Sequence, residues 1–386
     1  MHWNKKYIVM SMLLVHMLTY NKQSLNILFI VGHFPTPSQV FILNIMTGLI
    51  DLGHKVSICA LHKDTSLPIH PNVEKYKLMD RVKYTTLSSK LPKCDIVFCQ
   101  FGYLGKLLLV RQAKFAKSLK KRKLVVCFRG SDTSSYVQKD PKIYKKLFIE
   151  ANLLLPVCDY FKQKLIRLGC GAQKIEVYHS AIDCAKFFFT PRNKPEEGTI
   201  NIVSVCRLVK KKGVDDAIKA FAEVSQKYPQ LRYSIVGDGQ ERTYLELLVY
   251  QYGLQDKITF HGWKSQDEIV SILHNSHIFL LPSRRADDGN EEGIPNALKE
   301  AMAMGLIAIG TWHAGTPELI EHGTSGFLVP EKNIFQLSSI IEHILEHPEV
   351  WQEIGLAGRK KVEKEFETKR SVKQLEKLFY RLLAQN

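Results

Sequence analysis

Short apolar, β-branched runs recur along this chain with helix-like stretches between them, and they constrain the fold more than any other feature. They occupy residues 26–32, 55–61, 95–101, 124–130, 152–158 and 174–180 in the first half, and 201–208, 231–239, 257–263, 277–283, 306–312 and 326–330 in the second. The runs are continuously apolar instead of alternating, which is typical of strands buried on both faces of a helix-covered parallel sheet. The sequence therefore predicts an α/β fold of two doubly wound, Rossmann-like domains.

The length of 386 residues suits two such domains. Ligands bind outside the carboxyl ends of the strands in open parallel sheets, so two facing domains would share one ligand cleft. The polar stretch PRNKPEEGT separates the two sets of runs and is interpreted as a linker. We expect a first domain at 25–190, the linker at 191–199, a second domain at 200–365, and a final helix at 366–386 that packs back on the first domain.

The N-terminal end is treated separately, because residues 7–20 are largely apolar and follow two lysines. The stretch is too short to span a bilayer readily, which takes about 20 residues. It resembles the apolar part of a signal peptide, but no small-residue cleavage site follows it. We interpret residues 1–24 as an extension outside the fold, either an interfacial membrane helix or sequence upstream of the true start.

The net charge of +16 belongs entirely to the first half. Residues 1–198 hold 31 Lys and Arg against 13 Asp and Glu, whereas residues 199–386 hold 23 against 25. Such a basic field attracts nucleic acid, an anionic membrane surface or a phosphorylated substrate. The eight cysteines form no C-x-x-C pair, which indicates free thiols in a reducing compartment and neither a disulfide framework nor a zinc site.

The segment EEGIPNALKEAMAMG combines two acids with helix start and stop signals. Pro295 and Gly305 predict a helix over 296–304, with Glu292 in the preceding loop and Glu300 one turn inside. The free N–H groups and the dipole at a helix start form an anion site, and carboxylates bind hydroxyls strongly. This arrangement suits a ligand with a phosphate end and a polyhydroxyl end; the alternative is a capped surface helix with two solvated acids.

A cationic pair follows the first strand of the second half, in RLVKKKG. Arg207 and Lys212 are five residues apart across a strand-to-helix loop and can reach one anion, while Lys210 and Lys211 are expected to be solvated. With the helix that starts near Pro295, the pair can stabilise a leaving diphosphate electrostatically. The chain contains no Asp-x-Asp, G-x-G-x-x-G or P-loop, so we expect no metal and no cofactor.

Several segments occur in order at characteristic intervals, namely RLVKKKG, VGDGQER, FHGW, FLLPS, EEGIPNALKEAMAMG and GTPELIEHGTSGFLV. Together they resemble the retaining glycosyltransferases of family 4, which have the two-domain GT-B fold. HFPTPSQVFI and LPVCDYFKQKLIRLG are similar to the sub-group that builds exopolysaccharide, capsule or lipopolysaccharide. The resemblance covers roughly residues 25–385 and is most specific in 200–330.

The resemblance implies a role for each matching residue. Glu292 would contact the donor sugar near the reacting centre, Glu300 the nucleotide ribose, and Arg207 and Lys212 the diphosphate. Other donor contacts would come from the tight turn at Gly237, from Trp263 near the base, and from the backbone of Gly293, Ile294, Pro295 and Asn296. The resemblance also implies same-face attack without a protein nucleophile, so positioning and leaving-group stabilisation would carry catalysis.

Acceptor or phosphate contacts are expected from two loops of the first half. His33 and Ser38 lie in a Gly/Pro-rich turn after the first run, and Arg129 and Asp132 follow the fourth. Many family members have His in place of Arg129, which cannot act as a base but can bind a charged group. A turn with a helix cap is the alternative for this second loop.

Residues 111–123 carry Arg111, Lys114, Lys117 and Lys121 at helical spacing. This face is expected to dock on anionic lipid, because the acceptor of such enzymes is often lipid-linked; a solvated face is the alternative. We therefore expect a nucleotide-sugar donor, a glycan or lipid-linked glycan acceptor and an anionic membrane surface as partners, and no nucleic acid. The protein would be cytoplasmic and peripheral on the inner face of the cytoplasmic membrane.

Three functions stay open on these grounds. The first is a hexosyltransferase-type enzyme of surface polysaccharide biosynthesis that works without metal. The second is a non-catalytic GT-B partner subunit, and the third is a nucleic-acid-binding α/β protein, for which no aromatic-interleaved module is present.

Overall fold

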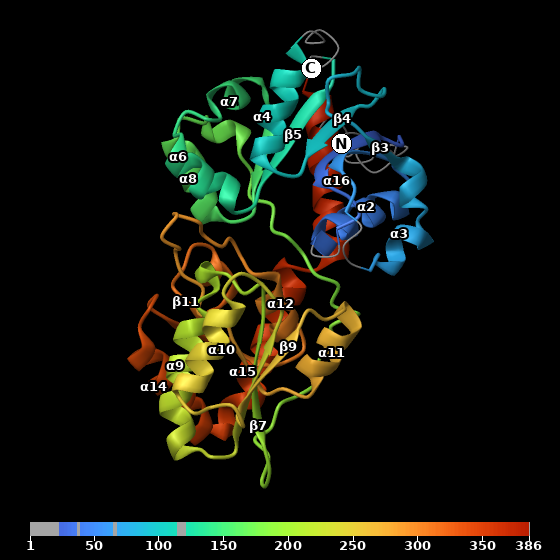
Figure 1. The fold of residues 1–386 in the computed structure, drawn as a ribbon. Helices are drawn as coiled ribbons and strands as arrows, with labels where there is room; N and C mark the ends of the chain where they lie inside the picture. The colour runs from blue at the N-terminus through green and yellow to red at the C-terminus, as the bar shows by residue number, and fades with distance from the viewer. Residues whose placement is uncertain (1–22, 37–38, 65–67, 114–120, 386) are drawn as a thin grey trace, which may run out of the picture.

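The computed structural model describes residues 23–36, 39–64, 68–113 and 121–385 (Figure 1). Each half of the chain contains a six-stranded parallel sheet, and helices cover both faces of each sheet. The strand orders are β3-β2-β1-β4-β5-β6 and β12-β11-β10-β7-β8-β9. Both orders reverse direction at the first strand of the half, which is the doubly wound arrangement. The predicted fold class is confirmed.

The first sheet consists of β1 (Asn26–His33), β2 (Lys55–His62), β3 (Val82–Tyr84), β4 (Ile96–Cys99), β5 (Lys123–Phe128) and β6 (Leu153–Pro156). The prediction of a strand at 174–180 was wrong. That segment follows β6 with two backbone hydrogen bonds, but it forms only the single bridge between Ile175 and Leu154. Sequence reasoning missed β3, because an edge strand of three half-exposed residues lacks a continuous apolar run.

The second sheet consists of β7 (Ile200–Val205), β8 (Leu231–Val236), β9 (Ile258–Gly262), β10 (Ile278–Leu280), β11 (Ile307–Thr311) and β12 (Phe327–Val329). Each corresponds to one of the six apolar runs predicted for this half. Residues such as Ile202, Phe279 and Ile309 have no more than 1% of their surface exposed, because helices cover both faces of the sheet.

The helices of the first half are α2 (Val40–Asp51), α3 (Pro71–Lys75), α4 (Gly102–Arg111), α6 (Ser135–Lys139), α7 (Lys145–Glu150) and α8 (Asp159–Arg167). Those of the second half are α9 (Val214–Lys227), α10 (Arg242–Gln251), α11 (Gln266–His274), α12 (Asn296–Ala303), α13 (Thr316–Leu319), α14 (Ile334–Glu346), α15 (Trp351–Glu365) and α16 (Thr368–Ala384). None of the described helices is both long and apolar enough to cross a membrane.

The last helix, α16, lies among the elements of the first half (Figure 1). Its Val372, Leu375 and Phe379 belong to the same buried cluster as Phe98 of β4. The Phe98 and Phe379 rings meet edge to face with their centroids 5.4 Å apart, a favourable arrangement for an aromatic pair. Residues 191–199 form neither helix nor strand and lead directly into β7. On these grounds we propose the domain boundaries given above, with α16 completing the first domain. The N-terminal extension lies almost wholly outside the described residues.

Candidate active site between the two domains

A cavity of about 580 Å³ is lined by residues of both halves of the chain. Phe41 and His70 line it from the first half, and Trp263, Asn296 and Glu300 line it from the second. These residues follow the carboxyl ends of strands or lie at the start of α12, where ligands bind in such sheets. We call this space the interdomain cavity.

Helix α12 begins at Asn296, as the sequence predicts, and ends at Ala303, one residue earlier than expected. Pro295 is the N-cap residue and lies just before the first turn. No side chain caps this end, so the first N–H groups of the helix are left for a ligand or water. The positive end of the helix dipole therefore faces the segment that carries Glu292.

Glu292 lies between two ammonium groups. Its Oε2 is 2.8 Å from Nζ of Lys212 and 3.3 Å from Nζ of Lys211. Burial by itself would raise the pKa of Glu292, but the two lysines outweigh this effect and hold the pKa well below its usual range. Glu292 is therefore a partly buried carboxylate, with 19% of its side chain exposed, that stays ionised at neutral pH.

The backbone of Glu292 is fixed from the opposite side by a histidine. Its N–H donates to Nε2 of His313 at 3.0 Å, and Nδ1 of His313 is 2.6 Å from Oε1 of Glu331. Because Nε2 accepts a hydrogen bond, the proton of the neutral ring lies on Nδ1 and is donated to Glu331. His313 therefore positions the loop of Glu292 and is not free to act as an acid or base on a ligand.

Lys211 is a site residue that sequence reasoning missed. Only 7% of it is exposed, although a run of three lysines is usually solvated. The three lysines form a short 3-10 turn, Lys210–Lys212, which directs the last two inward, while Lys210 remains exposed beside Asp287 as expected. No local sequence signal distinguishes the two buried lysines from the exposed one.

Arg207, like Glu292 and Lys212, is not among the residues that line the interdomain cavity. It is exposed and lines a second hollow of about 570 Å³ together with Asp238, Gly239 and Asp287. Gly237 lies at the same end of β8 with φ of 125°, and a Cβ atom there would overlap the carbonyl oxygen of Cys206. The turn at the end of β8 therefore requires glycine at position 237, because any side chain would collide with the end of the neighbouring strand β7.

Glu300 lines the interdomain cavity together with Trp263, whose side chain is 41% exposed. Burial raises the pKa of Glu300 to about 7, against the lowering effect of Lys299. Lys299 is itself fully buried, and burial lowers its pKa to about 7. Its Nζ donates to the carbonyl of Ser180 at 2.6 Å and to Oδ1 of Asn296 at 3.0 Å.

The loop before α12 also joins the two domains. Glu291 accepts a hydrogen bond from Tyr160 Oη at 3.0 Å, forms an ion pair with Lys164 of α8, and donates its N–H to Oγ of Ser134 at 3.2 Å. A Cβ at Gly293 would lie 2.7 Å from a methyl group of Val157, so the close approach of the domains requires glycine there. Sequence reasoning did not predict Glu291 as a contact residue.

Comparison with known proteins identifies the family of this chain. A family model described as "Glycosyl transferases group 1" matches residues 186–361. The chain is 32% identical to the amylovoran biosynthesis glycosyltransferase AmsK of Erwinia amylovora, over 92% of this chain and 99% of that protein. The chain belongs to the group 1 glycosyltransferases.

Two further likenesses concern the family and the fold, respectively. The glycosyltransferase is 31% identical to an Escherichia coli protein named as a colanic acid biosynthesis glycosyltransferase, WcaL, over 79% of this chain and 87% of that one. The crystal structure of Anabaena HepE in complex with UDP superposes with a TM-score of 0.74 at 16% identity, covering 92% of this chain and 100% of HepE. This likeness shows the shared GT-B fold, and the predicted family resemblance is confirmed.

In this glycosyltransferase, the guanidinium of Arg129 is already engaged. It donates to the carbonyl and the side-chain oxygen of Gln100 at 3.2 and 2.9 Å and to Oγ of Ser180 at 2.7 Å. It also lies over the ring of Phe41, 4.6 Å from the centroid. A charged acceptor would have to displace these partners, so Arg129 is placed to order the loop and only secondarily to bind a ligand.

Asp132 has a different task from the predicted contact with acceptor or phosphate. It is fully buried and accepts hydrogen bonds from the backbone N–H groups of Gly102, Arg129 and Gly130 at 2.8–2.9 Å. Burial raises its pKa against these hydrogen bonds. Asp132 therefore holds the loop together, which corrects the sequence prediction in favour of its structural alternative.

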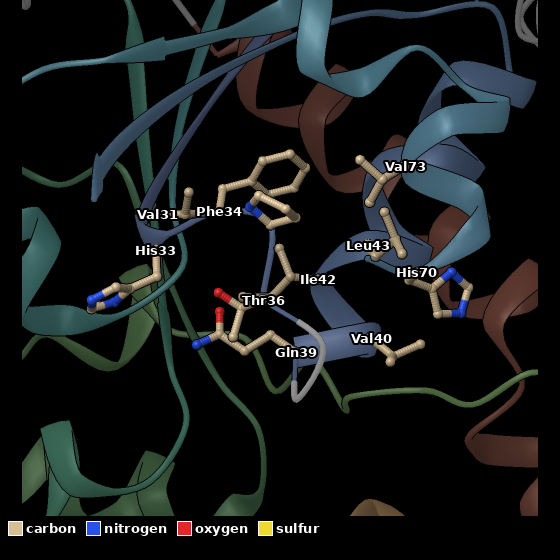
Figure 2. A pocket seen from close by; sticks show the side chains of 11 residues that line it. Val31, His33, Phe34, Thr36, Gln39, Val40, Ile42, Leu43, His70 and Val73 are labelled. Carbon is tan, nitrogen blue, oxygen red and sulfur yellow. The ribbon is translucent and has the colours of Figure 1, made fainter. Parts of the chain in front are cut away.

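The predicted acceptor turn after β1 borders a small cavity of about 20 Å³ (Figure 2). This volume holds about one water and no sugar. Thr36 lines the cavity, and its buried Oγ1 has no partner among the described residues. His33 is exposed and points away from the other lining side chains, with its ring 5.0 Å from that of His62. Ser38 lies outside the described residues.

Of the four cations predicted to dock on lipid, the structure describes two. Arg111 is the last residue of α4, and Lys121 lies two residues before β5; both are exposed. Lys114 and Lys117 lie outside the described residues. In the described part of the glycosyltransferase, no three His, Cys, Asp or Glu side chains are grouped to hold a metal ion.

Proposed function

We propose that this chain is a retaining glycosyltransferase that moves a sugar from a nucleoside-diphosphate sugar to a saccharide or lipid-linked saccharide in surface polysaccharide biosynthesis. The observation that carries the proposal is the ion pair between Glu292 and Lys212, 2.8 Å apart, beside the uncapped start of α12. The names of AmsK and WcaL, which refer to amylovoran and colanic acid, support surface polysaccharide as the product.

The proposed donor lies with its diphosphate between Lys212 and the first N–H groups of α12. Glu292 contacts the hydroxyls of the sugar, Glu300 those of the ribose, and Trp263 offers its exposed ring to the base. Arg207 approaches the diphosphate from the second hollow, which it lines together with Lys211. The backbone of residues 293–296 completes the phosphate contacts.

In the proposed reaction, the bond between the anomeric carbon and the phosphate oxygen breaks while the acceptor oxygen attacks the same face. The acceptor proton passes to the departing phosphate oxygen. Lys212 and the dipole of α12 stabilise the negative charge that develops on the diphosphate, so no metal is required. Glu292 is held by two lysines, which suits a positioning role better than that of a nucleophile.

A thermal-shift screen against UDP-, GDP- and dTDP-sugars tests the donor site, because a ligand that binds only the native state raises its melting temperature. We expect at least one donor to do so equally with and without EDTA. Lys212→Ala should abolish that shift, whereas the matched Lys210→Ala, a change at an exposed lysine, should keep it. A full shift in Lys212→Ala, or a shift that needs magnesium, would contradict the proposal.

We also propose that the protein associates peripherally with the inner face of the cytoplasmic membrane. The first domain carries the basic excess, and the exposed face of α16 adds Lys369, Arg370, Lys373 and Lys377, which line a hollow of about 580 Å³. The end of α16 adjoins the segment of Lys121, since Nζ of Lys123 donates to the carbonyl of Gln385 at 2.7 Å. Cations near an anionic leaflet contribute about 1 kcal/mol each.

A further inference from the structure

Lys211 has no part in the proposed reaction as written, yet its ammonium group is fully engaged. Nζ lies 3.3 Å from Oδ1 of Asn290, 3.2 Å from the carbonyl oxygen of Glu291 and 3.3 Å from Oε2 of Glu292. A lysine ammonium has three N–H donors, so these three oxygens use all of them. Lys211 is therefore committed to the loop that carries Glu292.

Lys212 differs from its neighbour in this respect. Among the residues that the structure describes, its Nζ contacts one acceptor, Oε2 of Glu292 at 2.8 Å. The two remaining N–H groups have no partner in that part of the chain. Of the two buried lysines, Lys212 is the one with donors to spare for the oxygens of a diphosphate.

The arrival of a diphosphate changes the balance of charge around Glu292. When Lys212 also donates to the phosphate oxygens, Glu292 shares its nearest cation with the ligand and gains anionic neighbours. A partly buried carboxylate that shares its cation with a second anion is destabilised, and it would either take up a proton or draw Lys212 back from the ligand. A second cation that does not leave removes this conflict.

We propose that Lys211 is a positioning residue that keeps Glu292 ionised and in place while Lys212 serves the diphosphate. The inference rests on the proposed donor site. Lys211 is suited to the task because its anchors, Asn290 and Glu291, belong to the same loop as Glu292. Two hydrogen bonds hold that loop. The N–H of Asn290 donates to Oδ1 of Asp288, and the N–H of Ala286 donates to the carbonyl of Asn290.

Double-mutant calorimetry tests this division of roles with nucleoside diphosphate alone. UDP and GDP are titrated into the wild-type protein, Lys211→Met, Glu292→Gln and the double variant. Lys211→Met should weaken binding about 10- to 100-fold, as expected for a lost hydrogen bond to a charged group. In the double variant the uncharged Gln no longer competes for Lys212, so binding should recover by about tenfold or more relative to Lys211→Met.

Two other results overturn the inference. If the double variant binds as weakly as Lys211→Met, Lys211 acts on the phosphate directly. If Lys211→Met lowers the melting temperature without changing the affinity, its role is only structural. Lys210→Met serves as the matched control and should bind like wild type. If the wild-type protein binds neither nucleotide, the proposed donor site fails and this inference fails with it. If the wild-type protein binds but the double variant does not regain affinity, only the inference about Lys211 is refuted.

Discussion

At the scale of single residues, the surroundings decide what each charged group does. Glu292 and Glu300 are the two acids of one motif, yet their pKa values move in opposite directions. Two lysines lower the pKa of Glu292, whereas burial raises the pKa of Glu300 to about 7. The same contrast separates the three lysines of one short turn, since Lys210 is exposed and the next two are buried.

Because the pKa of Glu300 is raised, we expect donor binding to depend on pH. Only the ionised carboxylate makes charge-assisted hydrogen bonds to ribose hydroxyls, and the free enzyme protonates Glu300 as the pH falls through about 7. We therefore expect the affinity for UDP or GDP to fall below pH 7 more steeply in wild type than in Glu300→Gln.

The comparison is made by calorimetry from pH 5.5 to 8.5. The nucleotide phosphate titrates in the same way with both proteins. The difference between their two plots of affinity against pH therefore reports the ionisation of Glu300 alone. Parallel profiles would show that the ionisation of Glu300 has no part in binding the nucleotide.

At the scale of elements, the loop before α12 serves both the site and the domain interface. Glu292 faces the lysine turn after β7, whereas the adjacent Glu291 contacts Tyr160 and Lys164 of α8 in the other domain. We therefore expect donor binding and domain approach to be coupled through these two consecutive residues. The lysine turn contacts the same loop, because Lys211 donates to the backbone carbonyl of Glu291 and pairs with the carboxylate of Glu292.

Glu291→Gln should weaken the contact between the domains. The variant keeps an acceptor for Tyr160 but leaves the Lys164 ammonium without its charged partner, at a cost of roughly 1–3 kcal/mol. We expect a lower melting temperature, a larger radius of gyration by small-angle X-ray scattering and a raised KM for the donor. Glu353→Gln, at an exposed position of α15, is the control. An unchanged radius and KM would mean that Glu291 does not join the domains in solution.

At the scale of the whole molecule, the basic excess of the first half and the exposed face of α16 point to an anionic membrane partner. The sequence ranges that supply them are far apart, since α16 follows the whole second domain. The helix brings its cations to the first domain because Leu375 and Phe379 on its other face are buried there. The charge asymmetry of the sequence therefore understates the basic character of that domain.

Charge reversal separates membrane binding from chemistry. Lys373→Glu with Lys377→Glu, and independently Arg111→Glu with Lys121→Glu, should each reduce co-sedimentation with anionic vesicles by about tenfold or more, given about 1 kcal/mol for each cation lost. Binding to zwitterionic vesicles and turnover with a water-soluble acceptor should stay unchanged. If neither pair alters sedimentation, the membrane proposal fails; if only one does, the docking surface is confined to that pair.

Much of the fold could be predicted from the sequence because its signals are local. The apolar runs gave eleven of the strands, and the Pro and Gly around 296–304 gave α12 to within one residue. Strand β3 was missed because an edge strand of three residues leaves no apolar run. Residues 174–180 were wrongly predicted to be a strand, because Tyr178 is buried there without the hydrogen-bonded pairing of a sheet. A side chain can be buried without its backbone pairing in a sheet, and an apolar sequence pattern predicts mainly the burial.

The sequence by itself determined the fold class, the family and the edge of the sheets where the chemistry lies, since periodicity and helix signals act over a few residues. The tertiary structure decided the task of each polar group. It buried Lys211 beside Glu292, engaged Arg129 with Gln100, and turned Asp132 inward to hold a loop. The physical reason is that charge state and hydrogen-bond partners depend on solvent exclusion and on segments distant along the chain, neither of which is encoded in local spacing.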